Sequence, residues 1–294
     1  MSKNTVVPHW DGLKGHLDGI KLVICDLWGV MHNGLSLFPD AVDAVLACRQ
    51  QGIKTVFLTN APKPATVIKG QLRDKGLPEE LLDNIVSSGS QTRDYVREKL
   101  AGKKLYHMGL KSDHQAVEGL PVTRVEDCIS ADFIFASGLD YKTAEDHVQV
   151  LEAAKERGVL FLCANPDRVV HVGDREWICA GAVADIYETM GGTVHWFGKP
   201  TKGAFDACLK KAGLSDKIKD DEVLVIGDSL LTDITGAVNA GHKSLLITSG
   251  IHRDSFRDLS QEIHWPALKG LPKPDGEGGS ADYMPTAVMR HLRF

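Results

Sequence analysis

Carboxylates end two of the short apolar runs in this sequence. Asp26 closes the run that begins at Leu22, Asp228 closes the run that begins at Val223, and Asp233 follows five residues later. Two carboxylates can share a hard divalent cation such as Mg²⁺, and a carboxylate can also attack phosphorus as a covalent nucleophile. These residue types therefore predict chemistry on a phosphoryl group.

Three further polar residues supply what such a reaction requires. Thr59 and Asn60 end another apolar run, and Lys199 follows the run 194–197. A lysine can hold the nucleophile ionised and neutralise phosphoryl oxygens, while a hydroxyl and nearby amides donate hydrogen bonds to them. A lone aspartate after a strand is more commonly a turn or N-cap residue, so the interpretation of Asp26 depends on these partners.

The elements that must position these residues alternate between short β-like runs and amphipathic helical runs. Strands are predicted near 22–25, 54–60, 84–86, 104–107, 131–136, 159–164, 194–197, 223–228 and 244–248. Helices are predicted over 39–51, 65–75, 90–100, 143–157 and 202–212, and a further helix follows the strand 223–228 and ends at about residue 240. A hairpin is predicted at 168–177, a loop at 266–285 and a helical turn at 287–292. This rhythm predicts an α/β fold with parallel sheets, whose ligands bind at the carboxyl ends of the strands.

The composition is that of a globular protein with room for one large domain or two ordinary ones. The 294 residues are 43% hydrophobic and 25% charged, which excludes a disordered or collagen-like chain. The net charge of -5, without a basic block, argues against a nucleic-acid partner. The six cysteines include no Cys-x-x-Cys pair, which predicts reduced thiols. The sequence shows no signal peptide and no long apolar segment, so we expect a cytoplasmic protein without membrane association.

Four segments at strand ends follow one another in a recognisable order: 26–30 (DLWGV), 58–60 (LTN), 198–200 (GKP) and 227–233 (GDSLLTD). They resemble the four motifs of the haloacid dehalogenase-like (HAD) superfamily of aspartate-nucleophile hydrolases. Roughly 140 residues separate the second segment from the third and include 163–167 and 181–183, which resembles the class IIA branch. The resemblance implies a Rossmannoid parallel-sheet core, residues 1–64 and 192–294, with an inserted α/β cap at 65–191.

The resemblance also implies a role for each matching residue. Asp26 would be the nucleophile that forms an aspartyl-phosphate, and Thr59, Asn60 and Lys199 would hold the phosphate. Mg²⁺ would be bound by the carboxylates of Asp26 and Asp228 and the backbone carbonyl of Trp28, with support from Asp233. The implied activity is a phosphatase acting on a small phosphorylated metabolite, and a homodimer formed through the cap would agree with the resemblance.

Trp28 departs from the family pattern. Typical phosphatases of the family carry a second aspartate here, which protonates the leaving oxygen and then activates water, whereas an indole N–H cannot exchange a proton at neutral pH. His32 or a bound water could take over that role. Two alternatives stay open: a hydrolase of a non-phosphoester bond, against which the retained Asp228 argues, and a weak or inactive protein that binds a phosphorylated ligand. Three residues are candidates for the substrate cleft: His32, just after the first segment, and Asn165 and Asp167, which follow the strand 159–164.

Overall fold

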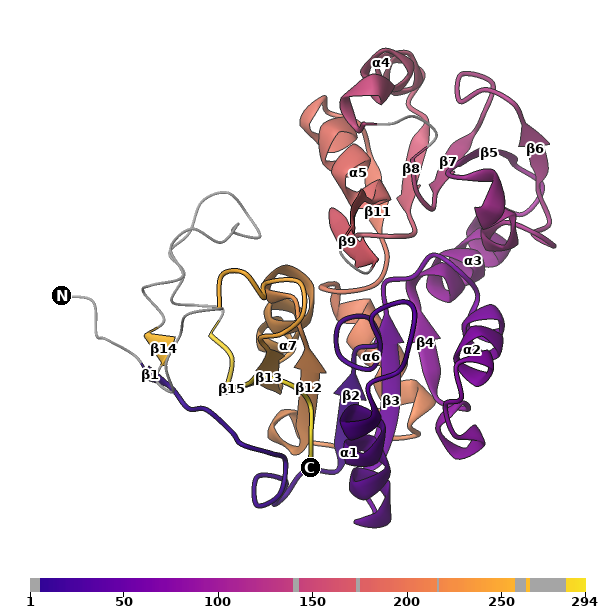
Figure 1. The fold of residues 1–294 in the computed structure, drawn as a ribbon. Coiled ribbons are helices and arrows are strands. Elements are labelled where there is room, and N and C mark those ends of the chain that lie inside the picture. Colours follow the sequence, from indigo (N-terminus) through magenta and orange to yellow (C-terminus); the bar gives the residue numbers. More distant parts are fainter. Residues whose placement is uncertain (1–5, 140–142, 173–174, 216, 257–262, 265–283) are drawn as a thin grey trace. The chain divides into compact units, whose positions relative to one another are not determined.

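The computed structural model describes residues 6–139, 143–172, 175–215, 217–256, 263–264 and 284–294 (Figure 1). The chain folds into two compact units. Unit 1 comprises residues 1–58, 72–85 and 205–294, and unit 2 comprises 59–71 and 86–204. The predicted core and cap boundaries, at 64/65 and 191/192, stay a prediction.

A six-stranded sheet organises the first unit. Its strand order is β15-β13-β12-β2-β3-β4. The strands are β2 (Leu22–Cys25), β3 (Lys54–Thr59), β4 (Ile85–Ser87), β12 (Val223–Gly227), β13 (Lys243–Ile247) and β15 (Ala287–Met289). The pairs β2–β3, β2–β12, β12–β13 and β13–β15 are parallel. Every residue of β2 and β12 is buried, as expected for central strands covered by helices on both faces.

Four α-helices connect the strands of this sheet: α1 (Pro39–Gln50), α2 (Ala65–Asp74), α6 (Lys202–Lys211) and α7 (Thr235–Asn239). Shorter segments are η1 (Glu79–Leu81), η4 (Asp220–Glu222) and the π-helical turn η5 (Leu230–Ile234), and β1 (Val6–Val7) pairs with β14 (Ile263–His264). The parallel α/β fold predicted from the sequence is confirmed.

The predicted helical turn at 287–292 is wrong. Ala287–Met289 instead form β15, which adds to the edge of β13 with Val288 opposite Leu246. Both residues are fully buried. A run of three apolar residues has no periodicity that separates strand from helix, so the unpaired edge of β13 decides its conformation. The predicted loop at 266–285 lies almost wholly outside the described residues.

A second, five-stranded parallel sheet organises the other unit, in the order β11-β8-β7-β5-β6. Its strands are β5 (Lys104–Met108), β6 (Thr123–Val125), β7 (Phe133–Ala136), β8 (Leu160–Cys163) and β11 (Val194–Trp196). The helical segments are α3 (Ser88–Lys99), η2 (Lys111–Ala116), η3 (Glu145–His147), α4 (Val148–Glu156) and α5 (Ala180–Thr189), and β9 (Val169–Val172) forms the predicted hairpin with β10 (Arg175–Ile178).

The two faces of this second sheet have separate apolar cores. Successive side chains of a strand point to opposite faces, and β7 follows that rule. Phe133 and Phe135 join a cluster that includes Val96 of α3, whereas Ile134 and Ala136 join the cluster of α4 and α5. This sheet is therefore covered by helical segments on both faces, like the first.

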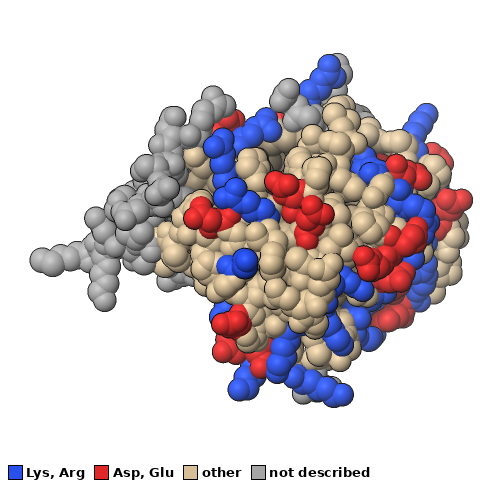
Figure 2. All heavy atoms as spheres, turned by 60° about the horizontal axis from the view of Figure 1, so that its bottom comes forward, with Lys and Arg blue, Asp and Glu red and all other residues tan. Residues whose placement is uncertain are grey.

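Two molecular properties bear on the predicted partners. None of the helices in the described part of the chain combines the length and the apolar run that crossing a bilayer requires. On the face drawn in Figure 2, basic and acidic side chains are interspersed, and no broad area carries positive charge alone.

Candidate active site

Three buried carboxylates meet at the carboxyl edge of the six-stranded sheet. Asp26 directly follows β2, Asp228 directly follows the neighbouring strand β12, and Asp233 lies in η5. Each offers a carboxylate oxygen within 4.8 Å of the others, and the residues are only 6%, 7% and 1% exposed. Buried anions this close repel one another, so the cluster fits a cation with hard oxygen ligands.

Backbone amides and close glycine contacts fix two of these carboxylates, Asp228 and Asp233. Ile251 donates its N–H to Asp228 Oδ2 at 2.7 Å, and Ser229 donates its N–H to Asp233 Oδ2 at 3.1 Å. Gly29 adopts φ +79°, and a Cβ at this position would lie 2.0 Å from Asp228 Oδ2. Gly250 approaches the same oxygen equally closely, so the main chain encloses the Asp228 carboxylate from two sides.

The half-buried side chain of Trp28 packs within the loop that follows Asp26. Its ring meets the ring of His32 edge-to-face, with centroids 5.1 Å apart. A Cβ at Gly34 would lie 2.7 Å from Trp28 Cζ2, so only glycine lets the loop lie against the indole. Lys75 fixes the same loop by donating from Nζ to Gly34 O at 2.7 Å.

His32 is a poor replacement for the missing aspartate. Burial, with a contribution from the positive charge of Lys75, lowers the pKa of His32 to about 4. Its Nδ1 accepts the N–H of Gly34 at 3.0 Å, which places the ring proton of the neutral imidazole on Nε2. At neutral pH this imidazole is uncharged and does not act as a proton donor of ordinary imidazolium strength.

Unit 2 holds the remaining predicted site residues, with Asn60 at their centre. Its Oδ1 accepts the backbone N–H of Lys199 at 2.8 Å, and its Nδ2 donates to Asp167 Oδ1 at 2.8 Å. Thr59 ends β3, and its Oγ1 accepts the N–H of Ala61 at 3.2 Å. Lys199 is 3% exposed, so Asn60 fixes the main chain that carries a buried cation.

The two candidate cleft residues of unit 2 lie in different surroundings. Asp167 contacts Asn60, as described above, whereas the Asn165 side chain accepts the N–H of Asp167 at 3.4 Å and stabilises the turn after β8. The roles of Gly29 and Gly250 could not be predicted from the sequence. Their only signal was a glycine near each carboxylate motif, which does not reveal contact with Asp228.

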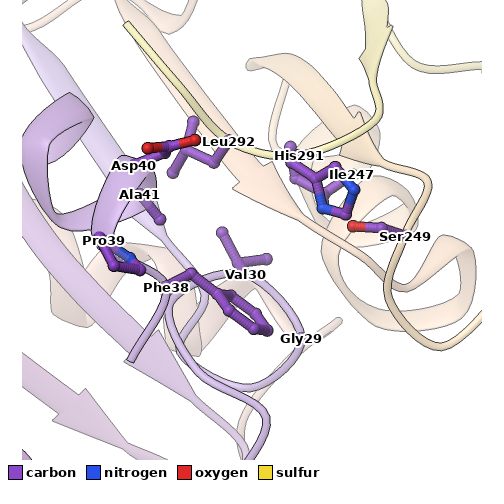
Figure 3. Close-up of a pocket in the computed structure, with 10 residues that line it drawn as sticks. All are labelled: Gly29, Val30, Phe38, Pro39, Asp40, Ala41, Ile247, Ser249, His291 and Leu292. Atoms are coloured by element: carbon purple, nitrogen blue, oxygen red, sulfur yellow. The ribbon is translucent and has the colours of Figure 1, made fainter. Parts of the chain in front are cut away.

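A cavity of about 200 Å³ lies in unit 1 beside the loop after Asp26 (Figure 3). Gly29 and Val30 form one wall, the start of α1 forms another, and His291 and Ser249 stand across from them. Its lining is mainly apolar and includes none of the predicted site residues. This cavity is therefore separate from the acidic cluster.

The sequence and fold of this chain are similar to those of known hydrolases. Residues 23–123 match a family model described as haloacid dehalogenase-like hydrolase, and residues 196–268 match a second, described as HAD-hydrolase-like. A crystal structure of a haloacid dehalogenase-like family hydrolase from Brucella suis 1330 is 30% identical, with a TM-score of 0.80, over 96% of this chain and 99% of that one. This chain belongs to the haloacid dehalogenase-like hydrolases.

Two curated relatives of this HAD-like hydrolase have named activities. Ribonucleotide monophosphatase NagD of Escherichia coli (strain K12) is 28% identical over 238 residues, which cover 79% of this chain and 89% of that protein. The acid sugar phosphatase of Staphylococcus aureus (strain MRSA252) is 26% identical over 263 residues, which cover 83% and 96%. Together with the family models, these relatives confirm the class IIA branch that the resemblance implied.

Proposed function

We propose that this HAD-like hydrolase is a Mg²⁺-dependent phosphatase that acts on a small phosphorylated metabolite through Asp26. The observation that carries the proposal is the buried cluster of Asp26, Asp228 and Asp233, whose oxygens lie within 4.8 Å of one another. The names of the relatives from E. coli and S. aureus support phosphomonoester substrates. The predicted core (1–64 and 192–294) and cap (65–191) are part of this proposal.

The donor set fits Mg²⁺, which prefers oxygen ligands and commonly binds one or two carboxylates together with a substrate phosphate. The carboxylates of Asp26 and Asp228 and the backbone carbonyl of Trp28 would hold it, with Asp233 in support. When bound, the ion offsets negative charge on the carboxylates and on the phosphoryl oxygens.

The residues of the chain would then act in two steps. A carboxylate oxygen of Asp26 attacks phosphorus, the bond to the leaving oxygen breaks, and an aspartyl-phosphate forms. Lys199 offsets charge on the phosphoryl oxygens, while Thr59 and Asn60 position the phosphate and the main chain of Lys199. Water then hydrolyses the aspartyl-phosphate and regenerates the Asp26 carboxylate. Because Trp28 donates no proton, esters with good leaving groups react best.

Trp28 also supports a second candidate function, a protein that binds a phosphorylated ligand with little turnover. General acid–base catalysis contributes about 10²- to 10⁴-fold, so its loss could leave binding as the main property. Hydrolysis of a non-phosphoester bond receives less support, because the retained Asp228 completes a cation site that dehalogenation does not use. The predicted homodimer and cytoplasmic location stay predictions.

Turnover of p-nitrophenyl phosphate with and without Mg²⁺ tests the proposal. We expect Mg²⁺-dependent release of p-nitrophenol by the wild type, loss of release in Asp26→Asn, and normal release in Asp43→Asn, a matched change on α1. Mg²⁺ at 100 times its Kd should stabilise the folded wild type by about 2.7 kcal/mol and so raise its Tm. The Tm of Asp228→Asn should not rise. A wild type as silent as Asp26→Asn with this activated ester would contradict the phosphatase.

A further inference from the structure

Three serines stand at the start of α3, and two of them have clear structural roles. Ser87 is the N-cap residue, and its Oγ accepts the N–H of Ser90 at 3.1 Å and donates to Lys63 O at 2.8 Å. Ser90 Oγ accepts the N–H of Ala65, the first residue of α2, at 2.9 Å. These bonds cap α3 and join it to the start of α2. The hydroxyl of Ser88 takes part in neither task.

This Ser88 hydroxyl is fully buried and has no hydrogen-bond partner among the described residues. Ser88 is 0% exposed, and its Oγ contacts no donor or acceptor within bonding distance in that part of the chain. An unpaired buried hydroxyl destabilises the folded state, and most buried polar groups in proteins are paired. A hydroxyl retained in such a place therefore calls for a partner from outside the chain.

Ser88 lies against the segment that carries Lys199. A Cβ at Gly198 would lie 3.0 Å from Ser88 Oγ and 2.5 Å from Asn60 Oδ1, and Gly198 has φ +83°. Only glycine therefore lets the main chain pass so close to both side chains. All four residues belong to unit 2, so the hydroxyl of Ser88 stands beside the main chain that leads into the buried lysine.

Other hydrogen-bond donors of this segment are already used within the protein. The side-chain amide of Asn60 donates in two directions, one of them to Lys199 O at 3.3 Å. The backbone N–H of Lys199 is donated to Asn60 Oδ1, and the backbone N–H of Gly198 is donated to Gln91 Oε1 at 3.1 Å. An anion at Lys199 therefore finds these amides occupied, whereas the Ser88 hydroxyl can still donate.

We propose that Ser88 donates a hydrogen bond to the phosphate group that Lys199 binds. The inference rests on the proposed phosphatase function and adds a binding residue to it. Lys199 and Asn60 are each 3% exposed, so a phosphate held by them enters the same buried environment as the Ser88 hydroxyl. A hydroxyl that donates to an anionic oxygen forms a short, charge-assisted bond. The phosphate supplies the partner that the described residues do not.

Binding of inorganic phosphate to the full-length protein with Mg²⁺ tests the proposal. The rise of Tm with phosphate concentration gives the Kd, and we expect Ser88→Ala to raise that Kd by about tenfold or more. Without phosphate, the Tm of Ser88→Ala should equal or exceed that of the wild type, because only an unpaired hydroxyl is removed. Ser88→Cys, which keeps a side chain of similar shape with a weak donor, should lose phosphate affinity as well.

Ser90→Ala is the matched control on the same turn of α3. It removes the acceptor of the Ala65 N–H, so it should lower the Tm without phosphate and change the Kd for phosphate by less than about twofold. Unchanged phosphate affinity in Ser88→Ala would overturn the role of Ser88. An equal loss of affinity in Ser90→Ala would overturn it too, because the effect would then come from disturbance of the helix start.

Turnover of p-nitrophenyl phosphate separates this inference from the function beneath it. A wild type that hydrolyses the ester, with Ser88→Ala binding phosphate as tightly, would overturn the role of Ser88 and leave the phosphatase standing. A wild type that binds phosphate without hydrolysing the ester would overturn the phosphatase, and weaker binding by Ser88→Ala would still support the contact. A wild type whose Tm does not respond to phosphate would overturn the contact.

Discussion

Trp28 stands where a proton donor would complete the proposed mechanism, and this makes a gain of activity testable. Replacing Trp28 with Asp supplies a carboxyl group two residues after the nucleophile. We expect turnover of unactivated phosphomonoesters to rise by about 10²- to 10⁴-fold, the usual contribution of general acid–base catalysis. Turnover of p-nitrophenyl phosphate should change little, since its leaving group needs no proton. Phosphate release from glucose 6-phosphate and from p-nitrophenyl phosphate measures the contrast.

The packing of the indole defines the control. Trp28 contacts His32 and the main chain at Gly34, so Trp28→Asp removes a ring from a tight loop and should lower the Tm. Trp28→Phe keeps an aromatic ring but lacks the N–H, and we expect its turnover to match the wild type. A rise in turnover with Phe as large as with Asp would show that indole removal, and not proton transfer, is responsible.

At the scale of the elements, the loops after β2 and β13 confine the acidic cluster through their glycines. A methyl group at Gly29 would lie 2.0 Å from Asp228 Oδ2, so Gly29→Ala must displace the carboxylate or the loop. We expect the Mg²⁺ concentration for half-maximal activity to rise by about tenfold or more, which corresponds to about 1.4 kcal/mol of lost binding free energy. Metal titration of p-nitrophenyl phosphate turnover measures this change.

Gly19→Ala is the matched control for this substitution. Gly19 has φ +78°, almost the same as Gly29, but no atom lies within 4 Å of its added Cβ. Both variants therefore carry the same backbone strain of about 1 kcal/mol, and only Gly29→Ala adds the clash. Equal metal dependence in the two variants would mean that the close approach to Asp228 has no role in metal binding.

The elements also show what the sequence could predict. Buried strands are continuous apolar runs, so the positions of Asp26 and Asp228 at neighbouring strand ends followed from local pattern. The contact of Asn60 with Asp167 and with Lys199 joins residues 107 and 139 positions apart, and no local pattern encodes it. β15 was missed for the same reason, because pairing with β13 determines its conformation.

For the molecule as a whole, burial of every cysteine predicts unreactive thiols. All six are buried without disulfides. Burial raises the pKa of Cys48 to about 11 and that of Cys179 to about 12, which leaves little of the reactive thiolate at pH 8. We expect no rapid reaction of the native protein with 5,5′-dithiobis(2-nitrobenzoate), and six equivalents after unfolding in guanidinium chloride. One or more fast equivalents with unchanged circular dichroism would contradict this burial.

The stability of the molecule should fall on mild acidification because of one buried histidine, His32, and one half-buried histidine, His252. Burial lowers the pKa of His32 and of His252 from 6.5 to about 4. Between these values the unfolded chain binds protons that the folded chain does not, so stability is greatest above pH 6.5 and falls towards pH 4, by up to about 3 kcal/mol for each histidine. Urea unfolding in EDTA at pH 7.5 and pH 5 measures the fall, which His252→Asn should reduce and His114→Asn, at an exposed position, should not. An equal fall in wild type and His252→Asn would mean that other groups set the pH dependence.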